Sequence, residues 1–273
     1  GETHHLGPPG HPGRTFGGAA LVGIPGAPPR HAGVLSRNHR RPPRGPGCPP
    51  DPTDWRLMLV NPWNAIPQGY QPELVTVENG YQVDQRCAND LAAMLADCRA
   101  AGYRPAICSA YRTQEKQAAL YDTLVRKRMA QGLSQTEAQK QAATEVAVPY
   151  TSEHQLGLAV DLVDASYQVL DEAQASTPAQ QWLMEHCWEY GFILRYPAEK
   201  QDITGIIYEP WHYRYVGRDH AQAIRQSGQC LEEFLQAEHP EQHKASRPLV
   251  WRPCGMIPAR FPRQRAKRVI SVG

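Results

Sequence analysis

The segment "TSEHQLGLAVDLVD", residues 151–164, combines a histidine and an aspartate that could bind a metal ion. Asp161 interrupts the apolar run "LGLAVDLV", and a carboxylate buried in such a strand needs a cation or strong hydrogen-bond donors. His154 lies seven residues earlier, and His212 in "YEPWHYRYVG" offers a third donor. Two histidines and one carboxylate are a common donor set for a zinc ion that keeps one position for water. These three residues therefore form a candidate zinc site.

A second carboxylate, Glu209, lies three residues before His212. Zinc lowers the pKa of bound water toward neutrality, and a carboxylate off the metal could accept its proton and pass it to a leaving amine. On a flat strand an odd separation places two side chains on opposite faces, so we expect Pro210 to form a kink or turn that brings them together. Spacing alone leaves a purely structural role open for each histidine, and the zinc-protease signature HExxH is absent.

The elements that must position these residues are mixed. Apolar periodicity predicts helices over residues 83–102, 113–132, 134–148 and 176–191, and short terminal helices within 218–238. It predicts a short buried strand that runs into a polar turn over 103–112, and strands over 156–163, 192–197 and 211–217. Because they show no regular βαβ alternation, we expect an α+β fold.

Local signals define the ends of several helices. We expect Asp84 to cap the first helix and Gly102 to end it, Ser134 and Glu137 to form a capping box, and Thr177 to cap the fourth helix. Helical spacing places the following residues on buried faces: Cys87, Leu91, Met94, Leu95 and Cys98 in the first helix, and Leu120, Tyr121, Leu124 and Val125 in the second.

Charge and composition divide the chain into three parts. Residues 1–50 hold 11 Pro, 11 Gly, six Arg and one Glu, residues 51–243 hold 15 basic and 26 acidic residues, and residues 244–273 hold eight basic residues and no acid. A Pro/Gly-rich segment without apolar periodicity buries too little surface to offset its ordering entropy. We therefore predict a disordered basic segment over 1–53, one domain over 54–240 and a disordered basic tail over 241–273.

The remaining features exclude several classes of protein. The seven cysteines are odd in number and form no CxxC pair, which argues against zinc-finger and thioredoxin folds. No apolar run approaches the length of a membrane span, and "GGAALVGIPGAPP" is too short and too rich in Gly and Pro for a signal-peptide core. Basic ends can bind anionic polymers, but solvated arms are the more common explanation.

Three ordered motifs resemble a known family. "SEHQLGLAVD" matches the SxHxxGxAxD pattern of the VanY-type zinc D-alanyl-D-alanine carboxypeptidases, which are LAS-type metallopeptidases. "EPWH" matches the ExWH pattern of that family, and "CSAYRTQEKQAALY" resembles its upstream SxYRxxxxQ segment. The motifs span roughly residues 104–217 in the family's order, and the resemblance covers most of 54–240 but neither terminal arm.

The resemblance implies a role for each matching residue. His154, Asp161 and His212 would bind one Zn²⁺ per chain, and Glu209 would be the catalytic base. Arg112 would stabilise the scissile carbonyl or the terminal carboxylate of the substrate, since a guanidinium suits either anion. The resemblance also implies that Ser152 and Gln117 line the substrate site, although Gln117 shares a helix face with Tyr121 and Leu124 and could instead pack there. The resemblance also implies the zinc DD-peptidase, or hedgehog-like, fold, in which a small antiparallel sheet is flanked by helices.

The implied activity is removal of the terminal D-Ala from peptidoglycan stem peptides that end in D-Ala-D-Ala. The alternatives within this fold are an L,D-carboxypeptidase, a D,D-dipeptidase or an endopeptidase, and the non-enzyme alternative is a zinc-containing module that binds wall peptides. We expect a monomer with no nucleic-acid partner and no transmembrane segment. The family implies a cell-envelope or extracellular location, and the sequence alone leaves a cytoplasmic one open.

Overall fold

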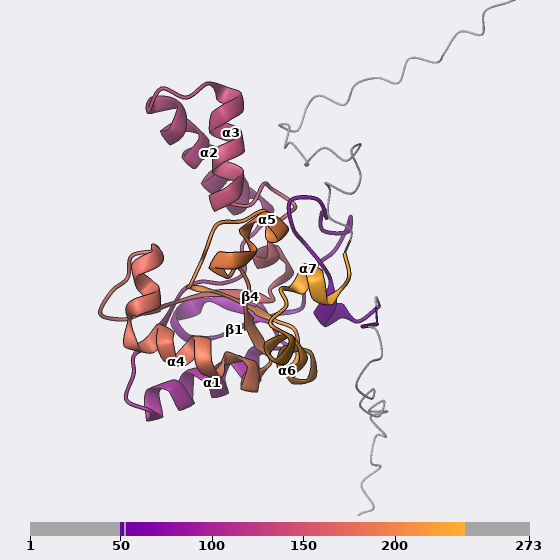
Figure 1. Cartoon of the computed structure of the whole chain (residues 1–273), viewed down its shortest axis with the longest axis vertical. Coiled ribbons are helices and arrows are strands. Elements are labelled where there is room, and N and C mark those ends of the chain that lie inside the picture. The colour runs from indigo at the N-terminus through magenta and orange to yellow at the C-terminus, as the bar shows by residue number, and fades with distance from the viewer. Residues whose placement is uncertain (1–49, 52, 238–273) are drawn as a thin grey trace, which may run out of the picture. The chain divides into compact units, whose positions relative to one another are not determined.

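The computed structural model describes residues 50–237, with the exception of Pro52 (Figure 1). The predicted tail 241–273, and the predicted disordered segment apart from residues 50, 51 and 53, lie outside the described residues. The helices are α1 Ala88–Ala100, α2 Gln114–Ala130, α3 Gln135–Glu145, α4 Pro178–His186, α5 Gln201–Thr204, α6 Arg218–Ser227 and α7 Leu231–Phe234. The strands are β1 Leu74–Thr76, β2 Gln82–Asp84, β3 Pro105–Ser109, β4 Ala159–Asp164, β5 Phe192–Leu194 and β6 His212–Tyr215.

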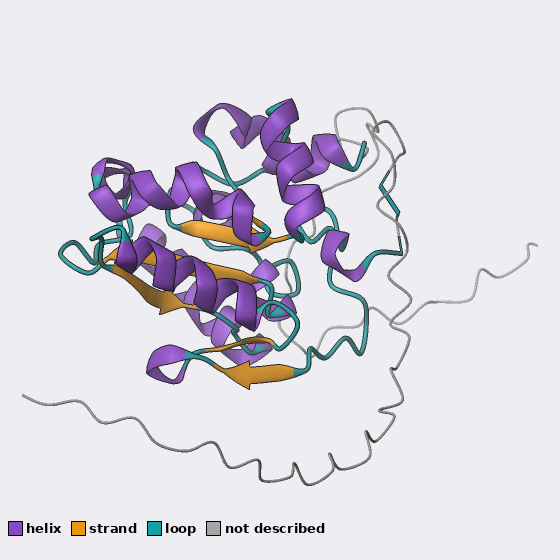
Figure 2. Ribbon diagram, turned by 90° about the horizontal axis from the view of Figure 1, so that it is seen from below, coloured by secondary structure: helices purple, strands orange, loops and turns teal. Residues whose placement is uncertain are grey.

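The strands form two antiparallel sheets. β1 pairs with β2, and the larger sheet has the order β3-β4-β6-β5 with every neighbouring pair antiparallel. Figure 2 shows the short strands packed among the helices. All six residues of the central strand β4 are buried, which explains its near-continuous apolar sequence. The predicted α+β fold with a small antiparallel sheet and flanking helices is therefore confirmed.

Helix α1 supplies much of the main core. Its predicted buried face is confirmed, since Leu91, Met94, Leu95 and Cys98 are almost inaccessible to solvent. The prediction that Asp84 caps this helix is wrong. Asp84 ends β2 and its carboxylate accepts from the backbone N–H and the guanidinium of Arg86, so it stabilises the turn between strand and helix. Cys87 occupies the N-cap position and makes no side-chain capping bond.

Helices α2 and α3 lie side by side, away from α1 and α4 in Figure 1. The predicted capping box of α3 is confirmed, because Ser134 and Glu137 exchange hydrogen bonds at its first turn. Tyr121 and Val125 of α2 pack in a small separate core with Ala138 and Ala142 of α3. Leu120 and Leu124 were predicted to be buried with them, but both are only half-buried and line a cavity described below.

Helix α4 begins as its sequence predicts. Thr177 caps it by accepting from the N–H of Gln180, and Pro178 occupies the first turn. The chain then continues as a 3₁₀ turn, Cys187–Tyr190, and ends at Gly191 with φ +82°. In the part of the chain that the structure describes, no helix combines the length and the apolar character that crossing a membrane requires.

Candidate metal centre

The larger sheet brings two of the candidate ligands together. Asp161 on β4 is the direct register partner of His212 on β6. On the other side, an irregularity in the β3–β4 pairing leaves Ser109 opposite Asp161. Paired residues of an antiparallel sheet project to the same face, so the carboxylate and the imidazole meet although 51 positions separate them.

The third candidate, His154, comes from the 3₁₀ turn Glu153–Leu156 just before β4. Gly157 ends that turn with φ +72°, and a Cβ at this position would lie 2.9 Å from the backbone nitrogen of Asp84. Only glycine combines this backbone conformation with so close an approach. The glycine of the motif therefore turns the chain from His154 into the strand that carries Asp161.

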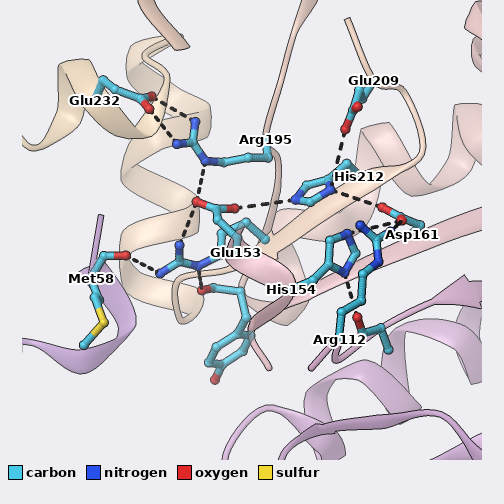
Figure 3. Close-up of polar contacts among 12 residues, drawn as sticks. Met58, Arg112, Glu153, His154, Asp161, Arg195, Glu209, His212 and Glu232 are labelled. Atoms are coloured by element: carbon cyan, nitrogen blue, oxygen red, sulfur yellow. Dashed lines mark hydrogen bonds and ion pairs between the residues drawn. The ribbon is translucent and has the colours of Figure 1, made fainter. Parts of the chain in front are cut away.

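The three side chains converge on a common point (Figure 3). One ligand atom from each of His154, Asp161 and His212 lies within 4.8 Å of the others, and all three residues are buried. Nε2 of His154 lies 3.2 Å from Oδ2 of Asp161, and Nδ1 of His212 lies 3.1 Å from Oδ1. Within the described residues, Oδ1 makes no hydrogen bond of acceptable geometry. A buried carboxylate oxygen without such a bond, facing imidazole nitrogens, fits a cation placed among them.

The ring of His154 is oriented for metal binding. Its Nδ1 lies 2.7 Å from the carbonyl oxygen of Ala110, which can only accept a hydrogen bond, so Nδ1 carries the proton. The Nε2 lone pair therefore faces Asp161. Burial, together with the charge of the nearby Arg112, lowers the pKa of His154 to about 4. A neutral imidazole with a carbonyl on its far nitrogen is the usual arrangement of a histidine ligand.

The charges of the other two candidates depend on their neighbours. Burial alone would raise the pKa of Asp161, but the imidazole of His154, together with His212 and Arg112, holds that pKa well below its usual range. Burial opposes protonation of His212, yet the neighbouring carboxylates of Asp161 and Glu153 raise its pKa to about 9. In the metal-free protein His212 thus holds a proton that a metal ion at Nδ1 would displace.

Glu209 lies beside this centre. Its carbonyl accepts from the N–H of His212, which closes a tight turn around Pro210 and confirms the predicted kink. Oε2 of Glu209 lies 3.7 Å from Nδ1 of His212, the nitrogen that faces the centre. Burial raises the pKa of Glu209 to about 8. A carboxyl group with a pKa near neutrality, next to a metal site and outside its ligand set, is suited to accept and return protons.

A cavity of about 440 Å³ opens onto these groups. His154, Asp161, His212, Glu209, Arg112 and Ser152 all line it. The rest of its wall is mostly apolar and comes from α2, the segment after α3 and the loop before β6; it includes Leu120, Leu124, Val146, Ile206, Ile207 and Trp211. The cavity therefore combines the polar centre with an apolar wall along which an extended ligand could lie.

Arg112 is held in place on three sides. It donates from Nη2 to Asp161 at 2.6 Å and from Nε to Ser109 at 2.8 Å, while Nη1 lies 3.5 Å from Oε1 of Gln117. Gln117 was predicted to line the substrate site. The structure places it elsewhere, fully buried behind Arg112, where its amide donates to the carbonyl of Ala147. Its observed contacts fix Arg112 and the chain after α3.

A buried acid next to the motif histidine was not predicted from the sequence. Glu153 is inaccessible to solvent and forms ion pairs with Arg195 and Arg214, and its second oxygen lies 3.5 Å from Nε2 of His212. The sequence does contain a sign of this buried acid, namely charged residues inside otherwise apolar segments. Arg195 interrupts "FILRYP" and Arg214 interrupts "HYRYV", and arginines in buried strands require an acid between them.

Comparisons with known proteins agree with this geometry. The VanY family, described as D-alanyl-D-alanine carboxypeptidase, matches residues 80–218. A D-alanyl-D-alanine carboxypeptidase of Enterococcus faecalis is 44% identical over 189 residues, covering 69% of this chain and 68% of the relative. A solved structure of VanYB in complex with D-alanine-D-alanine is 43% identical with a TM-score of 0.63, covering 68% of this chain and 99% of that chain. A solved structure of a vancomycin resistance D,D-pentapeptidase VanY mutant in complex with Zn(II) is also 43% identical, with a TM-score of 0.62, over 67% of this chain and 99% of that one.

Proposed function

The chain belongs to the VanY family of D-alanyl-D-alanine carboxypeptidases, and we propose that it is a zinc peptidase that releases the terminal D-Ala of peptidoglycan stem peptides. The observation that carries the proposal is the convergence of three buried ligand atoms within 4.8 Å of one another, beside an acid and at the end of a cavity. The matching residues and their order along the chain support the same activity.

His154 through Nε2, Asp161 through its carboxylate and His212 through Nδ1 would hold one Zn²⁺ per chain. When bound in such a site, zinc lowers the pKa of its water ligand toward neutrality and polarises a carbonyl group. The unbonded Oδ1 of Asp161 and the fixed tautomer of His154 support this donor set.

Glu209 would serve as the general base and then as the general acid. Its carboxylate accepts a proton from the attacking water as the new C–O bond forms at the scissile carbonyl. The same proton then passes to the leaving nitrogen as the C–N bond breaks, which releases D-Ala with a neutral amine or its ammonium form. The proximity of Glu209 to Nδ1 of His212 supports this role.

Arg112 would bind the substrate through the guanidinium N–H groups that remain free after its contacts with Asp161, Ser109 and Gln117. A guanidinium has five N–H donors in a fixed plane, and Arg112 lines the cavity next to the metal ligands. It can therefore donate to the carbonyl oxygen as charge develops there, or to the terminal carboxylate of the peptide. Ser152, on the same wall, would add a hydrogen bond to the peptide.

Peptide substrates of different length test the specificity. We expect D-Ala release from a pentapeptide stem that ends in D-Ala-D-Ala, with much slower cleavage of the tetrapeptide stem and of the free dipeptide D-Ala-D-Ala. Preferred cleavage of the tetrapeptide would instead identify an L,D-carboxypeptidase, and preferred cleavage of the dipeptide would identify a dipeptidase. Binding of all three without cleavage would favour a peptide-binding module. We propose that the chain acts in the cell envelope, where such stem peptides occur, as a monomer and without a nucleic-acid partner.

A further inference from the structure

A buried cluster of four charged side chains lies behind His212 (Figure 3). Glu153, Arg195 and Arg214 are inaccessible to solvent, and Glu232 of α7 is nearly so. Two arginines and two glutamates balance in formal charge. Burying them is costly unless each is paired and hydrogen-bonded, so their arrangement indicates either a structural requirement or a role at the neighbouring site.

The two oxygens of Glu153 have different environments. Oε1 accepts from Nε of Arg195 and from Nη1 of Arg214, each at 2.8 Å. Oε2 makes no hydrogen bond within the described residues and lies 3.5 Å from Nε2 of His212, which also has none. One oxygen is therefore fixed by two arginines, and the other is directed at the ring nitrogen on the far side of a candidate metal ligand.

The arginines leave Glu153 little freedom to turn. Arg214 also donates to the carbonyls of Arg56 and Met58, and Arg195 forms two further bonds with Glu232 at 2.9 and 2.6 Å. With these donors engaged in fixed directions, rotation of the Glu153 carboxylate would leave buried guanidinium groups without partners. The carboxylate is therefore held against His212 by Arg195, just after β5, and Arg214 of β6, which are themselves fixed by α7 and by the segment before β1.

We propose that Glu153 is a positioning residue whose Oε2 accepts the Nε2–H of His212 and thereby directs the Nδ1 lone pair of that ring at the zinc ion. The inference rests on the zinc site of the proposed function. A movement of about 0.5 Å brings the two atoms from 3.5 Å to an ordinary hydrogen-bond distance. The ring nitrogen of His154 that faces away from the metal then donates to the carbonyl of Ala110, and the corresponding nitrogen of His212 donates to the carboxylate of Glu153. Each acceptor fixes one tautomer of its histidine.

The variant Glu153→Gln tests the inference because the arginines dictate which way the amide points. Their N–H groups require an oxygen at the Oε1 position, so the NH₂ group faces Nε2 of His212. A donor there favours the tautomer with a proton on Nδ1, which cannot bind a metal through that atom. We expect the Kd for zinc, measured by competition with a chromophoric chelator, to rise about 10- to 100-fold.

The variant Glu232→Gln is the matched control. It makes the same change of charge and shape in the same cluster and affects Arg195, but it does not contact His212. We expect both variants to unfold at lower temperature, and the zinc Kd of Glu232→Gln to stay within about threefold of wild type, well below the effect expected of a metal-orienting partner. Equal weakening of zinc binding in both variants, or no weakening in Glu153→Gln, would overturn the inference.

If Glu153→Gln does not fold, NMR of the histidine ring N–H groups in the wild-type protein tests the same inference. In ¹⁵N-histidine-labelled, zinc-loaded protein, we expect two ring N–H resonances that persist in water: the Nε2–H of His212, and the Nδ1–H of His154, which faces the carbonyl of Ala110. Observation of the His154 proton alone would overturn the role of Glu153. Failure of the proposed function is distinguishable, because the wild-type protein would then bind no zinc at His154, Asp161 and His212 at all.

Discussion

Replacement of Glu209 by glutamine isolates the proposed proton transfer, because the two side chains share a shape but only the carboxylate takes up a proton readily. Oε2 of Glu209 lies 3.7 Å from Nδ1 of His212, next to the metal site, and Glu209 is not one of the three convergent ligands. The substitution should therefore leave the zinc in place. It should remove the group that accepts a proton from the attacking water and returns it to the leaving amine.

The expected loss is large. A positioned general acid–base group contributes about 10²- to 10⁴-fold to the rate. At about 1.4 kcal/mol per tenfold change, this corresponds to about 3–5 kcal/mol of activation free energy. We expect kcat for D-Ala release from a pentapeptide to fall by that factor in Glu209→Gln. Zinc in the same sample, measured by elemental analysis, should remain at one ion per chain.

The same variant should alter the stability of the metal-free protein in a pH-dependent way. Burial and, to a smaller extent, the charge of Asp161 raise the pKa of Glu209 to about 8 against the opposing effect of His212. Because the unfolded side chain has a pKa of about 4.3, the folded state holds the extra proton between these values and loses stability as pH rises through that range. At pH 7 this cost is about 4 kcal/mol, and glutamine does not have it.

Thermal unfolding in the presence of a chelator measures this effect. The melting temperature of Glu209→Gln minus that of wild type should be small at pH 4 and should become more positive toward pH 8. A difference that does not change with pH would contradict the environment described for Glu209. Retention of more than about a tenth of wild-type kcat would show that another group acts as the base, since the loss would then fall short of a general-base contribution.

Four further outcomes are expected. Arg112→Lys keeps the charge but loses the planar fork, so kcat/KM should fall about 10²-fold in steady-state assays while the zinc content stays the same. Gly157→Ala should lower the free energy of unfolding in urea by about 1–3 kcal/mol, because it combines a positive φ with a 2.9 Å approach to Asp84, whereas Gly102→Ala, with a positive φ in open space, should cost less. Removal of zinc with a chelator should abolish D-Ala release and lower the melting temperature, and added Zn²⁺ should restore both. Burial raises the pKa of the Cys187 thiol to about 12, so peptide mapping should find this residue unmodified by an alkylating reagent at pH 8 unless denaturant is present.

Features set by neighbouring residues along the chain could be predicted from the sequence. The capping box of α3 needs only Ser134 and Glu137, and the first turn of α4 needs only Thr177 and Pro178. The same holds for the odd spacing of Glu209 and His212, which predicts the turn that the structure contains. In each case local hydrogen bonds and backbone geometry dominate, and the rest of the fold does not override them.

Features set by tertiary pairing could not be predicted in this way. Asp84 resembles a helix cap in sequence, but it lies on a strand and Arg86 competes successfully for its carboxylate. Gln117 has the spacing of a site residue, yet its amide is occupied by the carbonyl of Ala147 at the end of α3. Both outcomes depend on partners that the helical pattern does not reveal.

The candidate metal ligands were predicted from the sequence, but the buried residues that position them were not. The motif residues His154, Asp161 and His212 do converge, as the resemblance implied. Glu153 escaped notice because it occupies a variable position of the motif pattern and its two arginine partners lie 42 and 61 positions away. Pairing over such separations depends on the order β3-β4-β6-β5, which apolar periodicity does not specify.

The convergence of His154, Asp161 and His212 on one metal ion is the claim on which the function depends, and anomalous diffraction at the zinc absorption edge tests it most directly. From a crystal of the zinc-loaded protein we predict one strong anomalous peak, about 2.0–2.2 Å from Nε2 of His154, a carboxylate oxygen of Asp161 and Nδ1 of His212. A map with no peak among these three side chains, or with zinc bound only at other residues, would contradict the account.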